Sequence, residues 1–158
     1  MLACRHATTD HRANDLGPDR ASQRNLTEEG VRQAKRIGAA VRALRIPIGE
    51  VRANPMYRNR ETAESAFGHA TVDSSLGPEG RYTAAEAVAA LRALLAKPVG
   101  RATNRVVVTR VGILNGAFEG EGLAPIEEGD CVIVQPLART TFRVVRHLKA
   151  SDWATLPP

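Results

Sequence analysis

The chain has 158 residues, of which 43% are hydrophobic and 25% are charged, with a formal net charge of +5. This length and balance are typical of one globular domain that can bury a core without a structural metal, so we expect a single domain over residues 1–158. No apolar run reaches membrane-spanning length, and the first one ends at Cys4, too early for a signal peptide. These features predict a cytoplasmic protein with no membrane partner.

The excess of positive charge does not by itself indicate a nucleic-acid-binding protein. The Lys and Arg residues are spread along the chain, and aromatic residues make up 4% of it. A nucleic-acid surface needs basic residues clustered on one face or a recognisable binding module. We therefore expect no nucleic-acid partner, and we interpret the charge as an anion-binding pocket combined with a bias towards arginine.

The cysteine and histidine positions show no spacing typical of a metal site, and no glycine-rich nucleotide loop is present. We therefore expect neither a metal nor another cofactor. Cys4 and Cys131 could pair, but because no secretory signal is visible we expect them to be free thiols that pack as small buried residues.

The first predicted element is a short buried strand over residues 1–4, which is followed by Arg5 and His6. A brief uninterrupted apolar run is typical of parallel α/β sheets, which carry their chemistry just past the carboxyl ends of the strands. His6 can attack phosphorus there, and the Arg5 guanidinium offers a planar set of donors to phosphate oxygens. The Arg-His pair alone leaves a solvated strand end as the alternative.

A long loop over residues 8–25 follows, and then comes the clearest helix of the chain. Thr27 is a good N-cap, Glu28 and Glu29 suit the positive end of the helix dipole, and an apolar face continues until Pro47. We expect this helix to pack on the sheet, whereas a loop in this place usually carries function.

Residues 49–54 predict a second strand, and a helix follows from Arg58 to Gly68. Arg58 then falls at a strand-to-helix turn, where backbone N–H groups and the helix dipole favour anions. Residues 70–74 predict another short strand, after which Thr83 opens a helix with a capping box.

The continuous β-branched run over residues 105–109 predicts a central buried strand, and Arg110 falls just past its end. The glycine-rich stretch over residues 116–122 predicts an irregular loop rather than a helix.

Residues 130–135 and 141–148 predict two further strands joined by a turn around Pro136. Strands that alternate with helices and then close on strands indicate an α/β fold. We predict three layers, with a mixed, mostly parallel central sheet flanked by helices.

Three short motifs occur in order along the chain: RHATT at residues 5–9, RNLTEEG at residues 24–30 and NPMYRNRETA at residues 54–63. They resemble Arg-His-Gly-x-Thr, Arg-x-Leu-Thr-x-x-Gly and Ser-Pro-x-x-Arg-x-x-Gln-Thr-Ala of the histidine phosphatase superfamily, the group that includes phosphoglycerate mutases and phosphohistidine phosphatases. The resemblance covers nearly the whole chain and implies a phosphoglycerate mutase-like fold.

The resemblance also implies roles for individual residues. It makes His6 the phosphorylated nucleophile and assigns Arg5 and Arg58 to the binding of the phosphoryl group. We add Thr9 and Arg24, which lie in the matched motifs, as predicted substrate-binding residues.

The sequence departs from the family at one catalytic position. The family's later strand ends in a second histidine, as in Val-Val-Thr-His, whereas this chain has Arg110 after Val107, Val108 and Thr109. An arginine supplies charge and hydrogen bonds, although with a different reach and geometry. We therefore count Arg110 among the catalytic residues, while His11 in the first long loop is a histidine that could approach instead.

Three guanidinium groups around His6 are expected to disfavour its protonation, which lowers the pKa of His6 and keeps its imidazole neutral and nucleophilic. The general acid is an open question. Asp73 and Glu79 lie where some family members place a carboxylate, but shorter members have none there, and surface carboxylates are usually just solvated.

Two functions follow from these motifs. The first is a phosphoesterase that acts on a small phosphorylated substrate through a phosphohistidine at His6. The expected binding partner is a small phosphorylated or other anionic substrate. The alternative is a protein of the same fold that has lost phosphatase activity and serves as an anion-binding or regulatory protein, or catalyses non-hydrolytic chemistry in the altered pocket. Function depends on the site rather than on the fold, and here the site is altered at Arg110.

Overall fold

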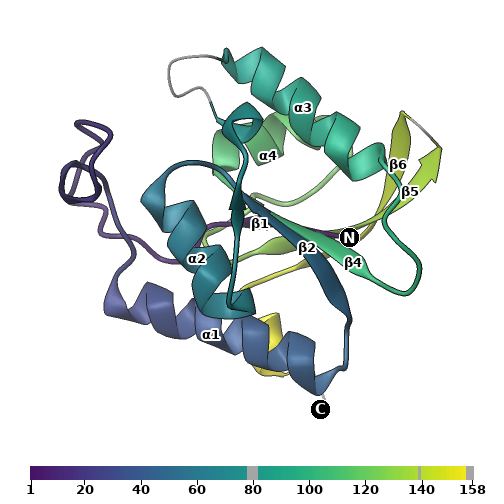
Figure 1. Cartoon of the computed structure of the whole chain (residues 1–158), viewed down its shortest axis with the longest axis horizontal. Helices are drawn as coiled ribbons and strands as arrows, with labels where there is room; N and C mark the ends of the chain where they lie inside the picture. Colours follow the sequence, from purple (N-terminus) through teal and green to yellow (C-terminus); the bar gives the residue numbers. More distant parts are fainter. Residues whose placement is uncertain (78–81, 139, 156–158) are drawn as a thin grey trace.

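The computed structural model describes residues 1–77, 82–138 and 140–155. At its centre lies a six-stranded sheet with strand order β3-β2-β4-β1-β5-β6 (Figure 1). The strands are β1 (Leu2–Arg5), β2 (Ile48–Ala53), β3 (Thr71–Val72), β4 (Asn104–Thr109), β5 (Cys131–Ala138) and β6 (Thr141–Leu148). The first four strands pair in parallel, whereas β5 is antiparallel to both β1 and β6. The predicted mixed, mostly parallel sheet is confirmed.

Helices cover both faces of the sheet and complete three layers. They are α1 (Glu28–Ala43), α2 (Tyr57–Phe67), α3 (Ala84–Ala96) and α4 (Val111–Ala117). Figure 1 shows α1 and α2 on one face and α3 and α4 on the other. None of the helices in the described part of the chain is both long and apolar enough to span a membrane.

The predicted helix boundaries follow from local hydrogen bonds. The Thr27 hydroxyl accepts a hydrogen bond from the Gly30 N–H, which satisfies one of the free donors at the start of α1. Thr83 and Glu86 form the predicted capping box of α3. Gly68 ends α2 with a φ of +82°, a conformation that glycine adopts without strain.

The central strands divide the core into two apolar clusters because successive side chains point to opposite faces of a sheet. Ala3 and Val107 pack in the cluster under α3 and α4. Leu2 and Val108 pack in the other cluster, together with residues of α1 and α2 and with the buried Trp153. The predicted burial of the β4 strand is confirmed.

Two local predictions were wrong. The helix α4 continues to Ala117, so the irregular loop predicted over residues 116–122 begins at Phe118 instead of Gly116. A Cβ at Gly116 would lie 2.5 Å from a methyl carbon of Val88, so this glycine allows α4 to approach α3 closely. Pro136, expected in a turn, lies inside β5. The hydrogen bonds between β5 and the N-terminal strand end where the N–H of Val134 donates to the carbonyl of Met1. Pro136 lies beyond this point, so its lack of an N–H costs no hydrogen bond to β1.

The expectation of free thiols was also wrong, because Cys4 and Cys131 form a disulfide. The two residues stand directly opposite each other in the antiparallel pair β1–β5, with Cα atoms 4.0 Å apart. The pairing of β1 with β5 brings the two sulfur atoms together. The sequence alone does not reveal which strands pair, so the disulfide could not be predicted from it.

Candidate active site

His6 lies just past the end of β1, between two other segments of the chain. Its N–H donates to the carbonyl of Thr109 at the end of β4 (3.2 Å), and its carbonyl accepts from the N–H of Gly129, just before β5 (2.9 Å). The His6 side chain is 1% exposed. The backbone of β4 and of the segment before β5 therefore fixes this residue at the carboxyl end of β1.

The orientation of the His6 ring determines which nitrogen can react. Nδ1 lies 2.9 Å from the carbonyl oxygen of Ala7, which can only accept a hydrogen bond. The proton of the neutral ring is therefore assigned to Nδ1, and Nε2 carries the free lone pair. This is the state in which an imidazole can act as a nucleophile through Nε2.

Burial and the surrounding charges together lower the pKa of His6 to about 4. Burial contributes most, because it disfavours the charged ring, and the guanidinium groups of Arg58 and Arg5 add to it. The Ala7 carbonyl and the carboxylate of Glu128 oppose them. His6 is therefore neutral at physiological pH, as predicted, although burial is the main cause rather than the arginines.

Arg5 is the last residue of β1, and its side chain is mostly buried. One terminal nitrogen donates to the carbonyl of Ile126 (2.9 Å) and lies 3.5 Å from the carboxylate of Glu127, while the other lies 3.7 Å from that of Glu128. The buried Nε of Arg5 has no partner in the described structure. Arg5 thus faces the segment before β5 and keeps one N–H donor unpaired.

Arg58 lies in the first turn of α2, and its side chain is 4% exposed. The hydroxyl of Thr62, one turn later, donates to the Arg58 carbonyl (2.6 Å) and accepts from the N–H of Ala7 (3.0 Å). These two bonds join the start of α2 to the residue that follows His6. The Nε of Arg58, like that of Arg5, is buried and has no partner in the described structure.

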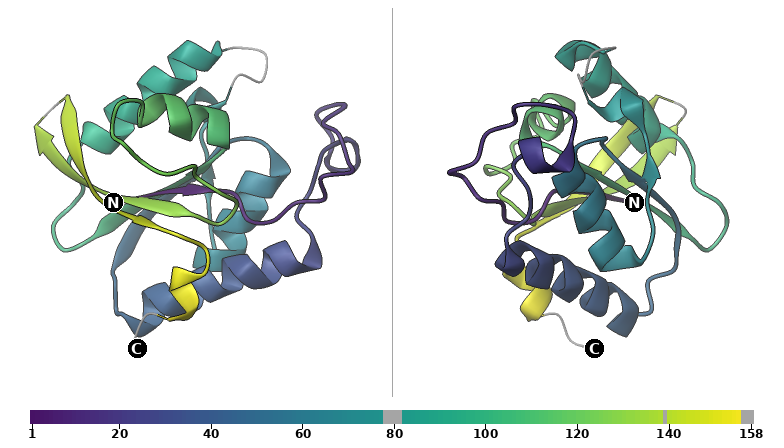
Figure 2. Two further views of the ribbon diagram at one scale, coloured as in Figure 1. Left: turned by 180° about the vertical axis from the view of Figure 1, so that it is seen from behind. Right: turned by 60° about the vertical axis from the view of Figure 1, so that its left-hand side comes forward.

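An acidic residue of the long loop is the partner of Arg58. The Asp15 carboxylate accepts hydrogen bonds from the Arg58 guanidinium (2.8 Å) and from the backbone N–H of Arg24 (3.0 Å). Asp15 therefore links two parts of the loop, at Asp15 and at Arg24, to the start of α2. Figures 1 and 2 show this loop standing out from the body of the fold, beyond the end of β1.

Glu128, which our sequence analysis did not single out, is the carboxylate nearest to His6 in the described structure. Its Oε1 atom lies 3.9 Å from the Nδ1 atom of His6, and its side chain is 10% exposed. The signal in the sequence is an acidic pair before Gly129 at the start of a strand. This acidic pair points to the site only when β5 is known to lie beside β1.

Both predicted substrate-binding residues lie near this site. The Thr9 hydroxyl donates to Glu128 (2.7 Å), and the Arg24 carbonyl accepts from the Arg58 guanidinium (3.4 Å). Thr9 is buried, and the Nε of Arg24 is a further buried donor without a partner among the described residues. Neither residue has been tested for substrate binding, so both assignments stay predictions.

Arg110 occupies the N-cap position of α4, directly after Thr109, and its side chain forms no capping hydrogen bond there. Its backbone is therefore next to the residue that binds the His6 N–H. Within residues 1–77, 82–138 and 140–155, its side chain forms no hydrogen bond or ion pair with another residue. The structure thus brings Arg5, His6 and Glu128 into close contact, while the role of Arg110 stays a prediction.

The remaining candidates have other partners or lie outside the site. His11 is 63% exposed in its side chain and lies 3.2 Å from a Glu128 oxygen. The Asp73 carboxylate pairs with Arg52 (2.8 Å). Glu79 lies outside the described residues.

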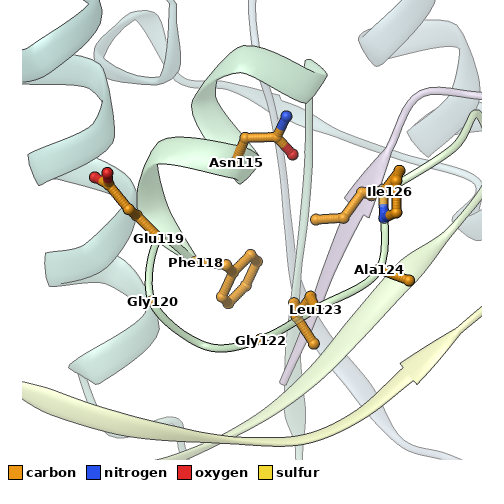
Figure 3. Close-up of a pocket in the computed structure, with 9 residues that line it drawn as sticks. Asn115, Phe118, Glu119, Gly120, Gly122, Leu123, Ala124 and Ile126 are labelled. Carbon is orange, nitrogen blue, oxygen red and sulfur yellow. The ribbon is translucent and has the colours of Figure 1, made fainter.

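A pocket of about 350 Å³ lies between α4 and the segment that leads to Ile126. Figure 3 shows the side chains that line it, among them the apolar Phe118 and Leu123 and the polar Asn115 and Glu119. The Ile126 carbonyl, which accepts the hydrogen bond from Arg5, belongs to the same segment. The wall of this pocket is therefore directly connected to the residues around His6.

No protein-family model matches the sequence, and no curated protein matches it either. Solved structures do match. The protein histidine phosphatase SixA, complexed with tungstate, has a TM-score of 0.72 at 18% sequence identity, and the match covers 96% of this chain and 97% of that one.

Two other solved phosphatases are similar over most of their length. A phosphoserine phosphatase of Entamoeba histolytica in complex with phosphoserine has a TM-score of 0.67 at 12% identity, covering 94% of this chain and 96% of that one. A mycobacterial glucosyl-3-phosphoglycerate phosphatase in complex with VO3 has a TM-score of 0.65 at 14% identity, covering 94% and 98%. The chain shares the fold of these phosphatases.

Proposed function

We propose that this protein is a phosphomonoesterase of the histidine phosphatase superfamily, in which His6 accepts the phosphoryl group of a small phosphorylated substrate. The observation that carries the proposal is the environment of His6. A buried, neutral imidazole with a free Nε2 stands beside two arginines, Arg5 and Arg58, each with a buried Nε–H that has no partner among the described residues. An oxyanion would satisfy such donors.

The sequence motifs and the structural neighbours support the same proposal. The motifs at residues 5–9, 24–30 and 54–63 resemble those of the superfamily. The neighbours with the same fold were solved with tungstate, VO3 or phosphoserine, which are oxyanions or carry a phosphate. We infer that this chain binds a phosphoryl group at the corresponding place, with the arginines as its ligands.

The proposed reaction has two steps. Nε2 of His6 attacks phosphorus, the bond from phosphorus to the ester oxygen breaks, and the leaving oxygen takes the electron pair and gains a proton from water. A second water molecule then attacks the phosphohistidine, the N–P bond breaks, and its electron pair returns to Nε2. The water gives up one proton, and inorganic phosphate leaves.

The arginines would act on the charge of the phosphoryl group. Arg5 and Arg58 present N–H donors to its oxygens, and we propose Arg110 as a third cation at the N-terminus of α4. Thr9 and Arg24 are proposed to contact the substrate. The general acid is not assigned, since Asp73 pairs with Arg52.

Hydrolysis of p-nitrophenyl phosphate by the wild type and two histidine variants tests this proposal. His6→Ala removes the proposed nucleophile, whereas His69→Ala removes an exposed histidine and serves as the matched control. The proposal predicts turnover by the wild type and by His69→Ala, and a loss of at least about 10³-fold for His6→Ala. Equal turnover by all three proteins would show that His6 is not the nucleophile.

A second candidate is a protein of the same fold that binds an anion without hydrolysing it, or that uses the pocket for non-hydrolytic chemistry. The feature that favours it is Arg110, which by the sequence resemblance takes the place of the superfamily's second histidine. Tight binding of the ground state does not by itself accelerate a reaction. This candidate predicts that the folded wild type binds tungstate but does not hydrolyse aryl phosphates.

A further inference from the structure

The carboxylate of Glu128 is held in a fixed place beside the proposed nucleophile. The Thr9 hydroxyl donates to its Oε1 atom (2.7 Å), and the Thr9 backbone N–H donates to its Oε2 atom (3.1 Å). The Gln33 side chain donates to the backbone carbonyl of Glu128 (3.2 Å) and accepts from the N–H of Thr8 (3.0 Å). Both the side chain and the backbone of Glu128 are therefore tied to the segment after His6.

The turn that carries Glu128 is tied to His6 as well. Gly129 has a φ of +84°, which a residue with a side chain rarely adopts. Its N–H donates to the carbonyl of His6 (2.9 Å). Asp130 accepts from the N–H of Glu127 (2.9 Å) and from His147 (2.9 Å). This turn has a defined shape that points the Glu128 side chain at the site.

The position of the negative charge matters for the chemistry. Oε1 of Glu128 lies 3.9 Å from Nδ1 of His6, the nitrogen that donates to the Ala7 carbonyl. Glu128 therefore stands on the Nδ1 side of the ring and leaves Nε2 free to meet phosphorus. Burial raises the pKa of Glu128, but the bonds from Thr9 and the nearby histidines outweigh it, so its pKa lies below the usual value and the carboxylate is ionised.

We infer that Glu128 is a positioning residue for phosphoryl transfer, whose carboxylate stabilises the positive charge that the His6 ring gains when Nε2 bonds to phosphorus. The inference rests on the proposed function. When the N–P bond forms, Nδ1 keeps its proton and the ring becomes cationic; when water breaks that bond, the ring is neutral again. The attraction to Glu128 is thus stronger in the transition state than in the free enzyme, which is the condition for acceleration.

The other charged groups at the site set the sign of this effect. His6 faces the guanidinium groups of Arg5 and Arg58, which oppose a positive ring, and the carboxylate of Glu128, which favours it. Glu128 in turn faces Arg5 (3.7 Å) and the exposed His11 (3.2 Å). Removing the charge of Glu128 leaves the ring facing two cations.

The test compares Glu128→Gln with Glu127→Gln, because Glu127 carries the same charge one residue away on a side chain that is 73% exposed. For Glu128→Gln we expect kcat for p-nitrophenyl phosphate to fall by about 10- to 100-fold, with a much smaller change in KM. We also expect the pKa of His6, measured by NMR titration of the ring without substrate, to fall further below about 4. Glu127→Gln should change both quantities far less.

Separate outcomes test the inference and the function on which it rests. A fall in kcat with an unmoved His6 pKa would show a merely structural role and overturn the inference. Should Glu128→Gln fail to fold, Glu128→Asp is the second variant, because it keeps the negative charge on a side chain that is shorter by one methylene. We expect a smaller fall in kcat for Glu128→Asp than for Glu128→Gln. Unaltered kinetics of Glu128→Asp would contradict the inference. The wild type could show no turnover while the pKa of His6 still responds to Glu128→Gln. That combination would overturn the proposed function and this catalytic role with it.

Discussion

The Asp15 carboxylate lies 2.8 Å from the guanidinium of Arg58. The arginine proposed to hold phosphoryl oxygens thus already has an anionic partner, supplied by the long loop after β1. An incoming phosphate must compete with this carboxylate or share the guanidinium with it. The pair is partly exposed on the Asp15 side, so competition is feasible at moderate cost.

Asp15→Asn is therefore expected to strengthen anion binding, because it removes the competing charge. We expect tungstate to bind about 3- to 10-fold more tightly than to the wild type, as measured by isothermal titration calorimetry. Asp19→Asn, the same change at an exposed position in the same loop, should have little effect. Weaker binding by Asp15→Asn would mean that the loop must be closed by this pair before an anion can bind.

The buried, neutral His6 makes stability depend on pH. Its pKa is about 4 in the folded protein, against 6.5 for a solvated histidine such as that of the unfolded chain. The unfolded state therefore binds more protons between these values, and stability falls as the pH drops from about 6.5 to 4. The expected contribution is about 3 kcal/mol.

Urea unfolding of the wild type and of His6→Asn between pH 7 and pH 4 checks this dependence. The difference in unfolding free energy between the two proteins should shift in favour of the variant as the pH falls, since the variant lacks the titrating ring. A difference that is constant across this range would contradict the low pKa of His6.

The disulfide between Cys4 and Cys131 predicts a stability that responds to reductant. It closes a loop with a sequence separation of 127 residues, for which the chain-entropy model gives up to about 5 kcal/mol. Dithiothreitol should lower the melting temperature of the wild type but not that of the Cys4→Ala/Cys131→Ala double variant. Equal melting temperatures of the wild type with and without reductant would show that the thiols are free.

Location is a related question. Disulfides persist mainly in oxidising compartments and are rare in the reducing cytosol. A persistent Cys4–Cys131 disulfide therefore argues against the cytoplasmic location expected from the sequence. Alkylation of free thiols in intact cells, followed by mass spectrometry of the Cys4 and Cys131 peptides, distinguishes the two states.

Arg110→His separates the two functions proposed for this fold. If Arg110 serves hydrolysis, introducing histidine at this position should raise kcat/KM for aryl phosphates less than about threefold, or lower it, because arginine and histidine differ in reach and geometry. A wild type that shows no turnover, together with hydrolysis by Arg110→His, would favour the second candidate, an anion-binding protein. Tungstate affinity measured in parallel shows whether the variant still forms the pocket.

The sequence predicted the layers and most elements because the signals were local. Thr27 and Thr83 cap helices through bonds within one turn, and the apolar run that forms β4 marks a buried strand by itself. The place of His6 at the end of β1 followed from the same kind of signal.

Most of the wrong or missing predictions depended on contacts between distant segments. Cys131 meets Cys4, and Glu128 reaches the site, because β5 runs antiparallel beside β1, and no local pattern specifies that pairing. The partner of Arg58 was missed for the same reason, since Asp15 lies 43 residues earlier in a loop without periodicity. The predicted loop starts too early at Gly116 because the close packing of this glycine against Val88 of α3 leaves no local signal in the sequence.

The most direct test of the central claim is to locate the phosphoryl group during turnover. The wild type is mixed with a radiolabelled phosphomonoester, quenched in alkali because phosphohistidine is labile in acid, and mapped by peptide. The account predicts label on the peptide that contains His6 and none in His6→Ala. Turnover without label on His6, or with label on another residue, would contradict it.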